Sequence, residues 1–339
     1  MSLLLSPIQV GTLHLKNRIV MAPMDMYQAR DGSPNAFHLH HYAARALGGT
    51  GLIIIEATAV SELGRISSED LGLWNNTQAE AFKPIVEACH YLGSKVAIQL
   101  NHAGRKNGSK EGRCCAPSAL GFAGFDEPHA LSVAEIERIE TEFVDAAKRA
   151  QKAGFDAVEI HAAHGYLLCS FLSPLSNQRN DEFGGSFENR MRLLGNVVQR
   201  IAAEVQIPIF VRISATEWEV GGWGIDDSVR LGLALQTLGV AMLDVSAGGN
   251  AHKPSLAPKP FPLYQAAYAK ELKANLSIPV SCVGLITRPS EGEALLLGGV
   301  CDLVAFGREL LRNPNLANEA AQVLGDTEKI EPSYVRAYR

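Results

Sequence analysis

The chain has 339 residues, of which 47% are hydrophobic and 20% charged, so it can bury one large core or two ordinary ones. Its formal net charge is −5 and it has no basic run, which argues against nucleic acid and anionic membranes as partners, since both bind clustered Lys and Arg. No apolar run approaches the roughly 20 residues of a membrane span, and residues 1–10 lack the cationic start of a signal peptide, so we expect a cytoplasmic protein.

Short apolar runs alternate with amphipathic stretches along the whole chain. The predicted strands are residues 18–21, 52–56, 95–100, 157–160, 209–213, 242–246, 280–283 and 303–306. Helical patterns between them include residues 133–153, 187–205, 226–238 and 289–297. Strands that are each followed by a helix predict a (β/α)8 TIM barrel, an α/β fold, rather than an open doubly wound sheet.

The remaining residues form three additions to this barrel. Residues 3–15 resemble a hairpin that would cap the barrel bottom, residues 101–132 form a long loop, and a tail follows Gly325. No Pro/Gly/Ser-rich linker and no internal repeat divides the chain. We therefore expect one domain over residues 1–339.

Residues that stand out from the apolar runs, most of them polar or glycine, fall at the carboxyl ends of the predicted strands. In chain order they are Pro23, Met24, Asp25, Ala57, Gln99, His161, His164, Arg212, Gly284, Gly307 and Arg308. A lone Gln or Arg in a strand is usually a rim or ion-pair residue. Their coincidence at one end of the barrel instead indicates a single pocket, because barrel enzymes place their chemistry there.

The run Glu159 to Tyr166 places two imidazoles and a phenol directly behind a buried strand. His161 and His164 could donate hydrogen bonds to one substrate oxygen while Tyr166 supplies a proton, which suits reduction of an activated double bond. Two other interpretations stay open, namely half of a metal site and ordinary buried histidines. The six cysteines form no CxxC pair that would hold zinc or an iron–sulfur cluster, so we expect reduced thiols and no metal.

Gly284, Gly307 and Arg308 indicate a phosphate site on the last two strands. Each glycine lets backbone N–H groups approach an anion, and Arg308 is predicted to open the final helix, whose amino end favours a phosphate. No GxGxxG follows any predicted strand. The pattern therefore favours a phosphate-bearing cofactor across the barrel top over a Rossmann dinucleotide site.

Several stretches resemble the flavin-dependent Old Yellow Enzyme family, in particular its short, thermophilic-like ene-reductase branch. They are LKNRIVMAPM, GLIIIEATAV, GRIS, IQLNHAGRK, GFDAVEIHAAHGYLLCSFLSPLSNQRNDEFGGSFENR, FVRISA and GRELLRNP, and the resemblance extends over residues 5–339. It implies a barrel that holds FMN non-covalently. It also implies an NAD(P)H-driven ene-reductase acting on enones, maleimides or nitroalkenes, with NADPH or NADH as the hydride donor.

The resemblance also implies individual roles. The flavin would be lined by Ala22, Pro23, Met24, Ala57 and Gln99, and its N1/C2=O edge would face Arg212. The phosphate would be held by Gly284, Gly307 and Arg308. The substrate oxygen would be bound by His161 and His164, Tyr166 would donate the proton, and Tyr27 would form the pocket lip. A permanently charged guanidinium beside N1 would stabilise the reduced flavin. Arg105 and Lys106 could steer a phosphate of NADPH, but solvated loop charges are the simpler interpretation.

Two positions depart from the family pattern. Asp25 stands where the branch usually carries a flavin-tuning cysteine; ionised, it would repel the reduced flavin, and protonated, it would donate to a flavin oxygen. In the tail, Ala337 and Tyr338 replace the usual Gly and Trp after Arg336, which in the branch reaches into the neighbouring subunit's active site. We expect a homodimer or homotetramer.

Three alternatives to an ene-reductase remain at this point. Two are related FMN barrels, namely a dienoyl thioester reductase and a dehydrogenase that runs in the oxidative direction. The larger dienoyl reductases add cluster cysteines and a second nucleotide-binding domain, neither of which is seen here. The third is a flavin-binding protein whose turnover is impaired by Asp25.

Overall fold

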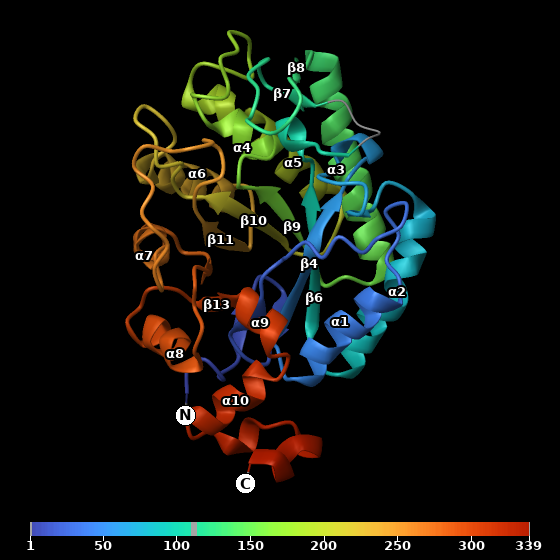
Figure 1. Cartoon of the computed structure of the whole chain (residues 1–339), viewed down its shortest axis with the longest axis vertical. Helices are drawn as coiled ribbons and strands as arrows, with labels where there is room; N and C mark the ends of the chain where they lie inside the picture. The colour runs from blue at the N-terminus through green and yellow to red at the C-terminus, as the bar shows by residue number, and fades with distance from the viewer. Residues whose placement is uncertain (1, 110–113, 339) are drawn as a thin grey trace.

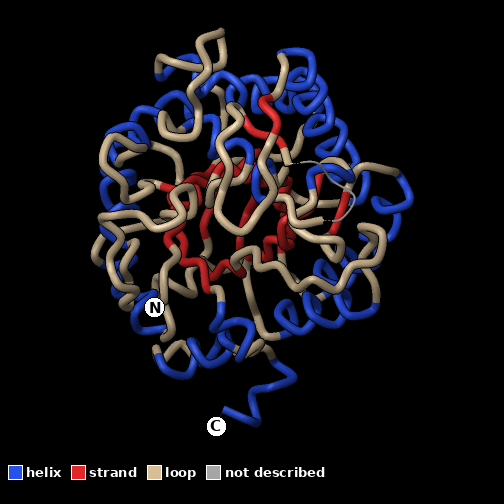
Figure 2. The backbone as a smooth tube through the Cα atoms, turned by 45° about the horizontal axis from the view of Figure 1, so that its top comes forward, coloured by secondary structure: helices blue, strands red, loops and turns tan. Residues whose placement is uncertain are grey.

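The computed structural model describes residues 2–109 and 114–338, so parts of the predicted loop (110–113) and both chain ends (Met1 and Arg339) lie outside the described residues. Eight parallel strands close into a barrel, in the order β3-β13-β12-β11-β10-β9-β6-β4, and pairing of β3 with β4 completes the ring. The ring of strands and the helices around it are seen in Figure 2. The predicted (β/α)8 barrel is confirmed.

The barrel strands lie where the apolar runs predicted them. They are β3 (Ile19–Met21), β4 (Leu52–Ala59), β6 (Lys95–Asn101), β9 (Ala157–Ala162), β10 (Ile209–Ser214), β11 (Met242–Ser246), β12 (Val280–Cys282) and β13 (Leu303–Phe306). Four of them, β4, β6, β9 and β10, extend one to three residues beyond the predicted carboxyl ends. Ala57 and His161 therefore lie inside strands, as Gln99 and Arg212 do, and all four are near the carboxyl ends.

The helices form the outer layer (Figure 1). They are α1 (Ala36–Leu47), α2 (Asn76–Tyr91), α3 (Val133–Ala153), α4 (Leu167–Leu172), α5 (Phe187–Glu204), α6 (Ile225–Thr237), α7 (Ala266–Asn275), α8 (Pro289–Leu297), α9 (Arg308–Arg312) and α10 (Leu316–Val323). Local sequence sets their ends. At α3, for example, the Ser132 side chain and Glu135 form a capping box, and Gly154 ends the helix with a φ of 92°, which glycine adopts without strain.

Two apolar layers hold the barrel together. The larger one lies between strands and helices, and a smaller one fills the barrel interior. The interior layer includes Val10, Leu13 and Leu15 from an antiparallel hairpin, β1 (Ile8–Val10) and β2 (Leu13–Leu15). The predicted hairpin cap is thus confirmed, since its apolar side chains close the interior from below.

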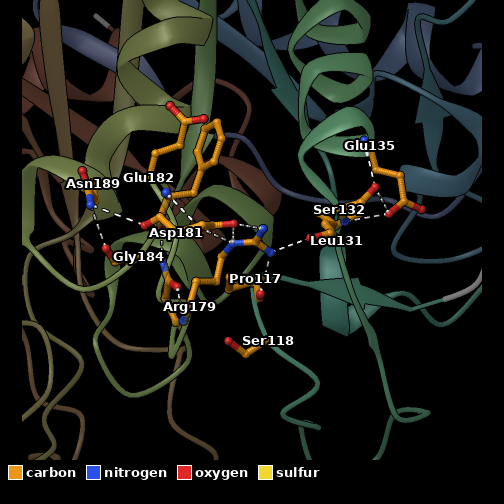
Figure 3. Close-up of polar contacts among 12 residues, drawn as sticks. Pro117, Ser118, Leu131, Ser132, Glu135, Arg179, Asp181, Glu182, Gly184 and Asn189 are labelled. Atoms are coloured by element: carbon orange, nitrogen blue, oxygen red, sulfur yellow. Dashed lines mark hydrogen bonds and ion pairs between the residues drawn. The ribbon is translucent and has the colours of Figure 1, made fainter.

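The predicted long loop contains the turn η2 (Gly104–Lys106) and a small sheet of β7 (Cys115–Ala116) and β8 (His129–Ala130). Outside this loop, a two-residue strand, β5 (Leu71–Gly72), pairs with β4. Figure 3 shows what anchors the long loop. The Arg179 guanidinium donates to the carbonyl oxygens of Pro117 (3.0 Å) and Leu131 while its Nε binds both oxygens of Asp181, at 3.0 and 3.1 Å. The SNQRNDEFGG stretch, which lies between α4 and α5, therefore anchors the loop.

The tail after Gly325 forms two short turns, η3 (Thr327–Lys329) and η4 (Pro332–Tyr338). It lies beside α10, at the end of the molecule opposite α4 and the β7–β8 sheet (Figure 1). No helix among residues 2–109 and 114–338 is long and apolar enough to cross a membrane.

Candidate active site

The His161–Tyr166 segment turns sharply at the end of β9. His161 is the fifth residue of that strand, His164 has a φ of 59°, Gly165 has a φ of 76°, and Tyr166 precedes α4. A Cβ at Gly165 would lie 2.4 Å from the Gly249 carbonyl oxygen, so only glycine fits this close approach to the loop after β11. The turn fixes the direction of both imidazoles.

The two histidines contact each other and their surroundings through defined ring nitrogens. His161 Nδ1 accepts from the Ala163 N–H (3.2 Å), His161 Nε2 lies 3.4 Å from His164 Nδ1, and His164 Nε2 lies 2.8 Å from Ser246 Oγ. Burial lowers the pKa of both well below the ordinary value, and the Arg212 charge acts in the same direction. Both imidazoles are therefore neutral at physiological pH.

Tyr166 packs edge-on against His161, with ring centroids 4.9 Å apart. Burial raises the pKa of its phenol well above the ordinary value, and Asp25 and Tyr27 raise it further. Tyr166 therefore keeps its proton and can act as a donor. Among residues 2–109 and 114–338, no group of three or more His, Cys, Asp or Glu side chains could hold a metal ion.

Next to the histidines, charged side chains form a buried layer inside the barrel, and Arg212 is the cross-strand neighbour of His161. Arg212 Nε lies 3.0 Å from Asp244 Oδ2, and Gln99 Nε2 donates to Glu159 Oε1 at 2.8 Å. The Arg212–Asp244 contact is an ion pair without the direction of a hydrogen bond, because neither atom has a hydrogen-bond partner. Desolvation, followed by repulsion from Asp244, raises the pKa of Glu159 to about 8, so Glu159 is neutral at pH 7.

A cavity of about 240 Å³ opens beside this layer, at the ends of β12 and β13. It is lined by Arg212, Gly284, Gly307 and Arg308, which the sequence had assigned to the flavin and its phosphate. The Arg308 side chain is exposed and has no hydrogen-bond or ion-pair partner in the described part of the chain. A Cβ at Gly307 would meet only Met24 Sδ, at 3.5 Å, so space remains above the backbone there. These residues fit an anionic, ring-bearing cofactor.

Arg308 opens α9 as predicted, but α9 is not the final helix. It has only five residues and is followed by α10. A helix this short adds little dipole at its amino end. The case for a phosphate therefore rests on the Arg308 guanidinium and the backbone at Gly284 and Gly307, rather than on the helix.

Asp25 lies against β4, where its Oδ1 accepts from the Ala57 N–H at 3.2 Å. Desolvation raises its pKa to about 7, with further contributions from the Asp70 and Glu56 carboxyls. The protonated and ionised forms, which were alternatives from the sequence, are therefore both populated at neutral pH. Burial, and after it Asp25, raises the pKa of Tyr27 to about 12, and 45% of the Tyr27 residue is exposed.

The interpretation of Arg105 and Lys106 as solvated loop charges is wrong. Arg105 is buried and its Nη2 donates to Asn250 O (2.6 Å) and Oδ1 (2.8 Å). Lys106 Nζ donates to the carbonyl oxygens of His164 (2.7 Å) and Gly249 (2.5 Å), and burial lowers its pKa to about 8. Lys106 thus joins the loop after β11 to the histidine turn, and Arg105 joins the same loop to η2.

Other predicted residues are placed as follows. Ala22, Pro23 and Met24 directly follow β3, and the Ala22 N–H donates to Phe306 O at 3.1 Å. Arg336 is exposed on η4, at the far end of the molecule from α4 and hence from Tyr166 (Figure 1). Sequence reasoning did not assign Glu159, Asp244, Ser246 or Gln265. Asp244 could have been identified from the sequence, because it is a charged residue inside an apolar run.

The family model for the "NADH:flavin oxidoreductase / NADH oxidase family" matches residues 3–327. The chain is 45% identical over 342 residues to an NADPH dehydrogenase of Listeria monocytogenes serotype 4b (strain CLIP80459), covering 100% of both chains. It is 42% identical over 341 residues to the NADPH dehydrogenase of Bacillus subtilis (strain 168), covering 99% of both.

Comparison with solved structures indicates the same family. Morphinone reductase in complex with tetrahydroNAD matches with a TM-score of 0.82 and 30% identity, covering 98% of this chain and 93% of that one. The old yellow enzyme homologue from Zymomonas mobilis matches with a TM-score of 0.80 and 30% identity, covering 99% of each chain. The chain therefore belongs to the NADH:flavin oxidoreductase / NADH oxidase family, that of the old yellow enzymes, and is an oxidoreductase that uses FMN with NADPH or NADH.

Proposed function

We propose that this oxidoreductase is an ene-reductase, which reduces the activated C=C bond of an enone, maleimide or nitroalkene. The observation that carries the proposal is a cluster of two neutral imidazoles and a protonated phenol at the carboxyl end of β9, in which the His161 ring lies 5.1 Å from the His164 ring and 4.9 Å from the Tyr166 ring, measured between centroids. These groups combine hydrogen bonding to a substrate oxygen with a proton source. Bound FMN supplies hydride transfer, with NADPH or NADH as its source.

Each side chain has a separate task in this proposal. The histidine pair holds the carbonyl or nitro oxygen, where negative charge develops as the double bond is reduced. Tyr166 keeps its proton until the α-carbon becomes basic enough to take it. Arg212 lies in the cavity wall with its charge partly balanced by Asp244, so it can stabilise negative charge on the cofactor ring.

The cofactor phosphate is proposed to be held by Gly284, Gly307 and Arg308. The cofactor ring is proposed to be bordered by Ala22, Pro23, Met24, Asp25, Ala57 and Gln99. Tyr27 is proposed to form the lip of the substrate pocket. Because Arg336 lies far from its own chain's histidines, it can serve a site only in a second copy. We therefore include a homodimer or homotetramer in the proposal.

The double variant His161→Ala/His164→Ala tests the oxygen site. It should weaken binding of a phenol and of an enone by about 1 to 3 kcal/mol per lost donor while FMN stays bound. His129→Ala, in the β7–β8 sheet, is the matched control, because its ring contacts Glu135 and Cys114 instead. Unchanged phenol affinity in the double variant would show that the pair does not bind the substrate oxygen.

Turnover separates the remaining alternatives. NADPH oxidation should accelerate when an enone is added to the yellow protein, and the product should be the saturated ketone. A protein that only binds flavin would be reduced slowly or not at all, and an oxidative dehydrogenase would convert the saturated compound faster than the enone. A panel of enones, maleimides and nitroalkenes, tested with NADPH and with NADH, identifies the preferred pair.

A further inference from the structure

Glu159, Arg212 and Asp244 lie inside the barrel, between its apolar interior and the histidine pair. Side chains of a strand alternate between its two faces, so residues two positions apart point to the same side. Two positions before each charged residue stands a member of the apolar interior layer, namely Ala157, Phe210 and Met242. Two positions after each stands a member of the histidine pair or a serine that contacts His164, namely His161, Ser214 and Ser246. The charged layer therefore has hydrocarbon on one side and the active site on the other.

Few hydrogen-bond donors reach the two carboxyl groups of this layer. Glu159 is fully buried, Gln99 Nε2 donates to its Oε1 at 2.8 Å, and its Oε2 has no hydrogen-bond partner among the described residues. Asp244 is also fully buried, and the Arg212 guanidinium is its ion-pair partner. A buried carboxylate is costly unless nearby charges and donors compensate for the lost water. One cation therefore supports one carboxylate here, and Glu159 keeps its proton.

The groups that face Glu159 set the pH at which it loses this proton. Desolvation raises the pKa of Glu159 to about 8, and Asp244 on β11 contributes to the increase. Arg212 on β10 and the Gln99 hydrogen bond from β6 act in the opposite direction. His161, two residues further along β9, is neutral. A change in the charge beside Arg212 should therefore move the ionisation of Glu159.

We propose that Glu159 is a redox-linked proton site, which binds a proton from solvent when the cofactor ring beside Arg212 is reduced. This inference rests on the proposed position of that ring. In the reduction, a C–H bond of NADPH breaks with both electrons, an N–H bond forms on the ring, and the ring is left with one negative charge. That charge opposes a second anion behind Arg212, as Asp244 already does. Where Glu159 is ionised beforehand, its carboxylate takes up one proton, and the total charge of ring and layer stays constant.

The midpoint potential of the FMN-loaded protein tests this proton uptake at equilibrium. Below about pH 8, Glu159 already carries its proton, so it adds nothing to the pH dependence of the potential. Above about pH 8, reduction should bind one further proton, and the potential should fall by about 30 mV more per pH unit, the two-electron equivalent of a tenfold change in the equilibrium constant. The titration is made in Asp25→Asn, which removes the other carboxyl expected to ionise beside the flavin. An equal slope on both sides of about pH 8 would overturn the proposal.

Infrared difference spectra of the reduced and oxidised protein detect the proton directly. A protonated carboxyl has a C=O stretching band that a carboxylate lacks. About one pH unit above the pKa of Glu159, reduction of Asp25→Asn should produce such a band, and the band should shift in deuterium oxide and on carbon-13 labelling of glutamate. A band that shifts with labelled aspartate instead, or no band at all, would overturn the assignment to Glu159.

Matched variants assign the effect to this side chain. Glu159→Gln, made in the Asp25→Asn background, should lose both the additional slope and the carboxyl band. Glu217→Gln is the control, because Glu217 is also a buried glutamate, and its Oε1 accepts from Ser173 Oγ (2.7 Å) and the Trp223 N–H (2.5 Å). It should keep both signals, and their loss in both variants would overturn the assignment. If Glu159→Gln fails to bind FMN, the labelled-glutamate spectrum of Asp25→Asn decides alone.

These measurements separate the inference from the proposed function, because the cofactor is reduced at an electrode and no enone is present. Enone reduction by a protein that shows neither the additional slope nor the carboxyl band would overturn the inference and leave the proposed function in place. Both signals in a protein that does not reduce enones would support the proton site on Glu159 and overturn the ene-reductase.

Discussion

Arg212 and Asp244 are cross-strand neighbours in the barrel register, and their side chains form a buried ion pair with Nε 3.0 Å from Oδ2. Glu159, on the other side of Arg212, is held neutral partly by Asp244. Arg212, Asp244 and Glu159 thus bring a cation, an anion and a proton-bearing carboxyl together. If the Asp244 charge is removed, Glu159 can lose its proton and pair with Arg212 instead.

Asp244→Asn should therefore lead to ionisation of Glu159. Loss of one partner of a buried ion pair costs about 3 to 5 kcal/mol when the other charge stays unpaired. We expect a smaller loss in Asp244→Asn, because Glu159 can take over, and the full loss in Asp244→Asn/Glu159→Gln. Chemical denaturation of the parent, both single variants and the double variant measures the coupling. Additive losses would show that Glu159 does not replace Asp244.

The pH dependence of stability provides a separate test of Glu159. Its pKa is about 8 in the folded protein against an ordinary 4.5, so between these values the unfolded chain binds fewer protons. Stability attributable to this group therefore falls as pH rises through that window, by at most about 1.4 kcal/mol per pH unit. Glu159→Gln should flatten the decline of the free energy of unfolding between about pH 5 and 8. An unchanged slope would mean that Glu159 is ionised in the folded protein.

Tyr166→Phe keeps the ring that packs on His161 and removes only the hydroxyl. Flavin reduction by NADPH should persist, whereas reoxidation by an enone should slow by about 100-fold or more, the range typical of a lost general acid. The slowing should be largest for substrates whose α-carbon is least basic. Stopped-flow measurement of the two half-reactions separates them. An unchanged rate of reoxidation would show that solvent or another residue donates the proton.

Sequence patterns identify those site residues whose position depends on neighbouring residues in the chain. The apolar runs predict the barrel, and Gln99, Arg212 and the histidines are visible because they interrupt those runs. Arg105 looks solvated in sequence, but its burial depends on Asn250, 145 residues away. The hydrogen bonds of Gln265 likewise depend on Ser246 and Val283, which only the fold brings to it.

The tail gives a prediction about subunits. If Arg336 serves the partner's site, Arg336→Ala should weaken substrate binding without changing the assembly measured by sedimentation. Coexpression of this variant with His161→Ala/His164→Ala should then restore about one quarter of the parental activity for random pairing into dimers, because half of the dimers carry one complete site. Activity no higher than that of the two variants expressed separately would show that each chain uses only its own residues.

Asp25 provides a pH-dependent test of the cofactor site. With a pKa of about 7, its carboxyl is mostly neutral near pH 6 and mostly ionised near pH 8. An ionised carboxyl disfavours the negative charge of a reduced flavin, so Asp25→Asn should raise the midpoint potential by tens of millivolts near pH 8, on the scale of one charge in an effective dielectric of about 20. Near pH 6 the parent and variant potentials should nearly coincide.

Asp70→Asn is the informative companion to Asp25→Asn, because Asp70 is one of the carboxyls that raise the pKa of Asp25. Ile66 N–H donates to Oδ2 of Asp70 and the Ser67 hydroxyl donates to Oδ1; in Asn one oxygen can still accept from the Ile66 N–H while the NH2 group donates to the Ser67 oxygen, so the local turn should survive. Without the Asp70 charge, Asp25 should ionise at lower pH. The extra pH dependence of the potential should move down with it, as spectroelectrochemical titration would record. If Asp25→Asn leaves the potential unchanged at every pH, Asp25 influences only the shape of the pocket, and its carboxyl does not act on the flavin.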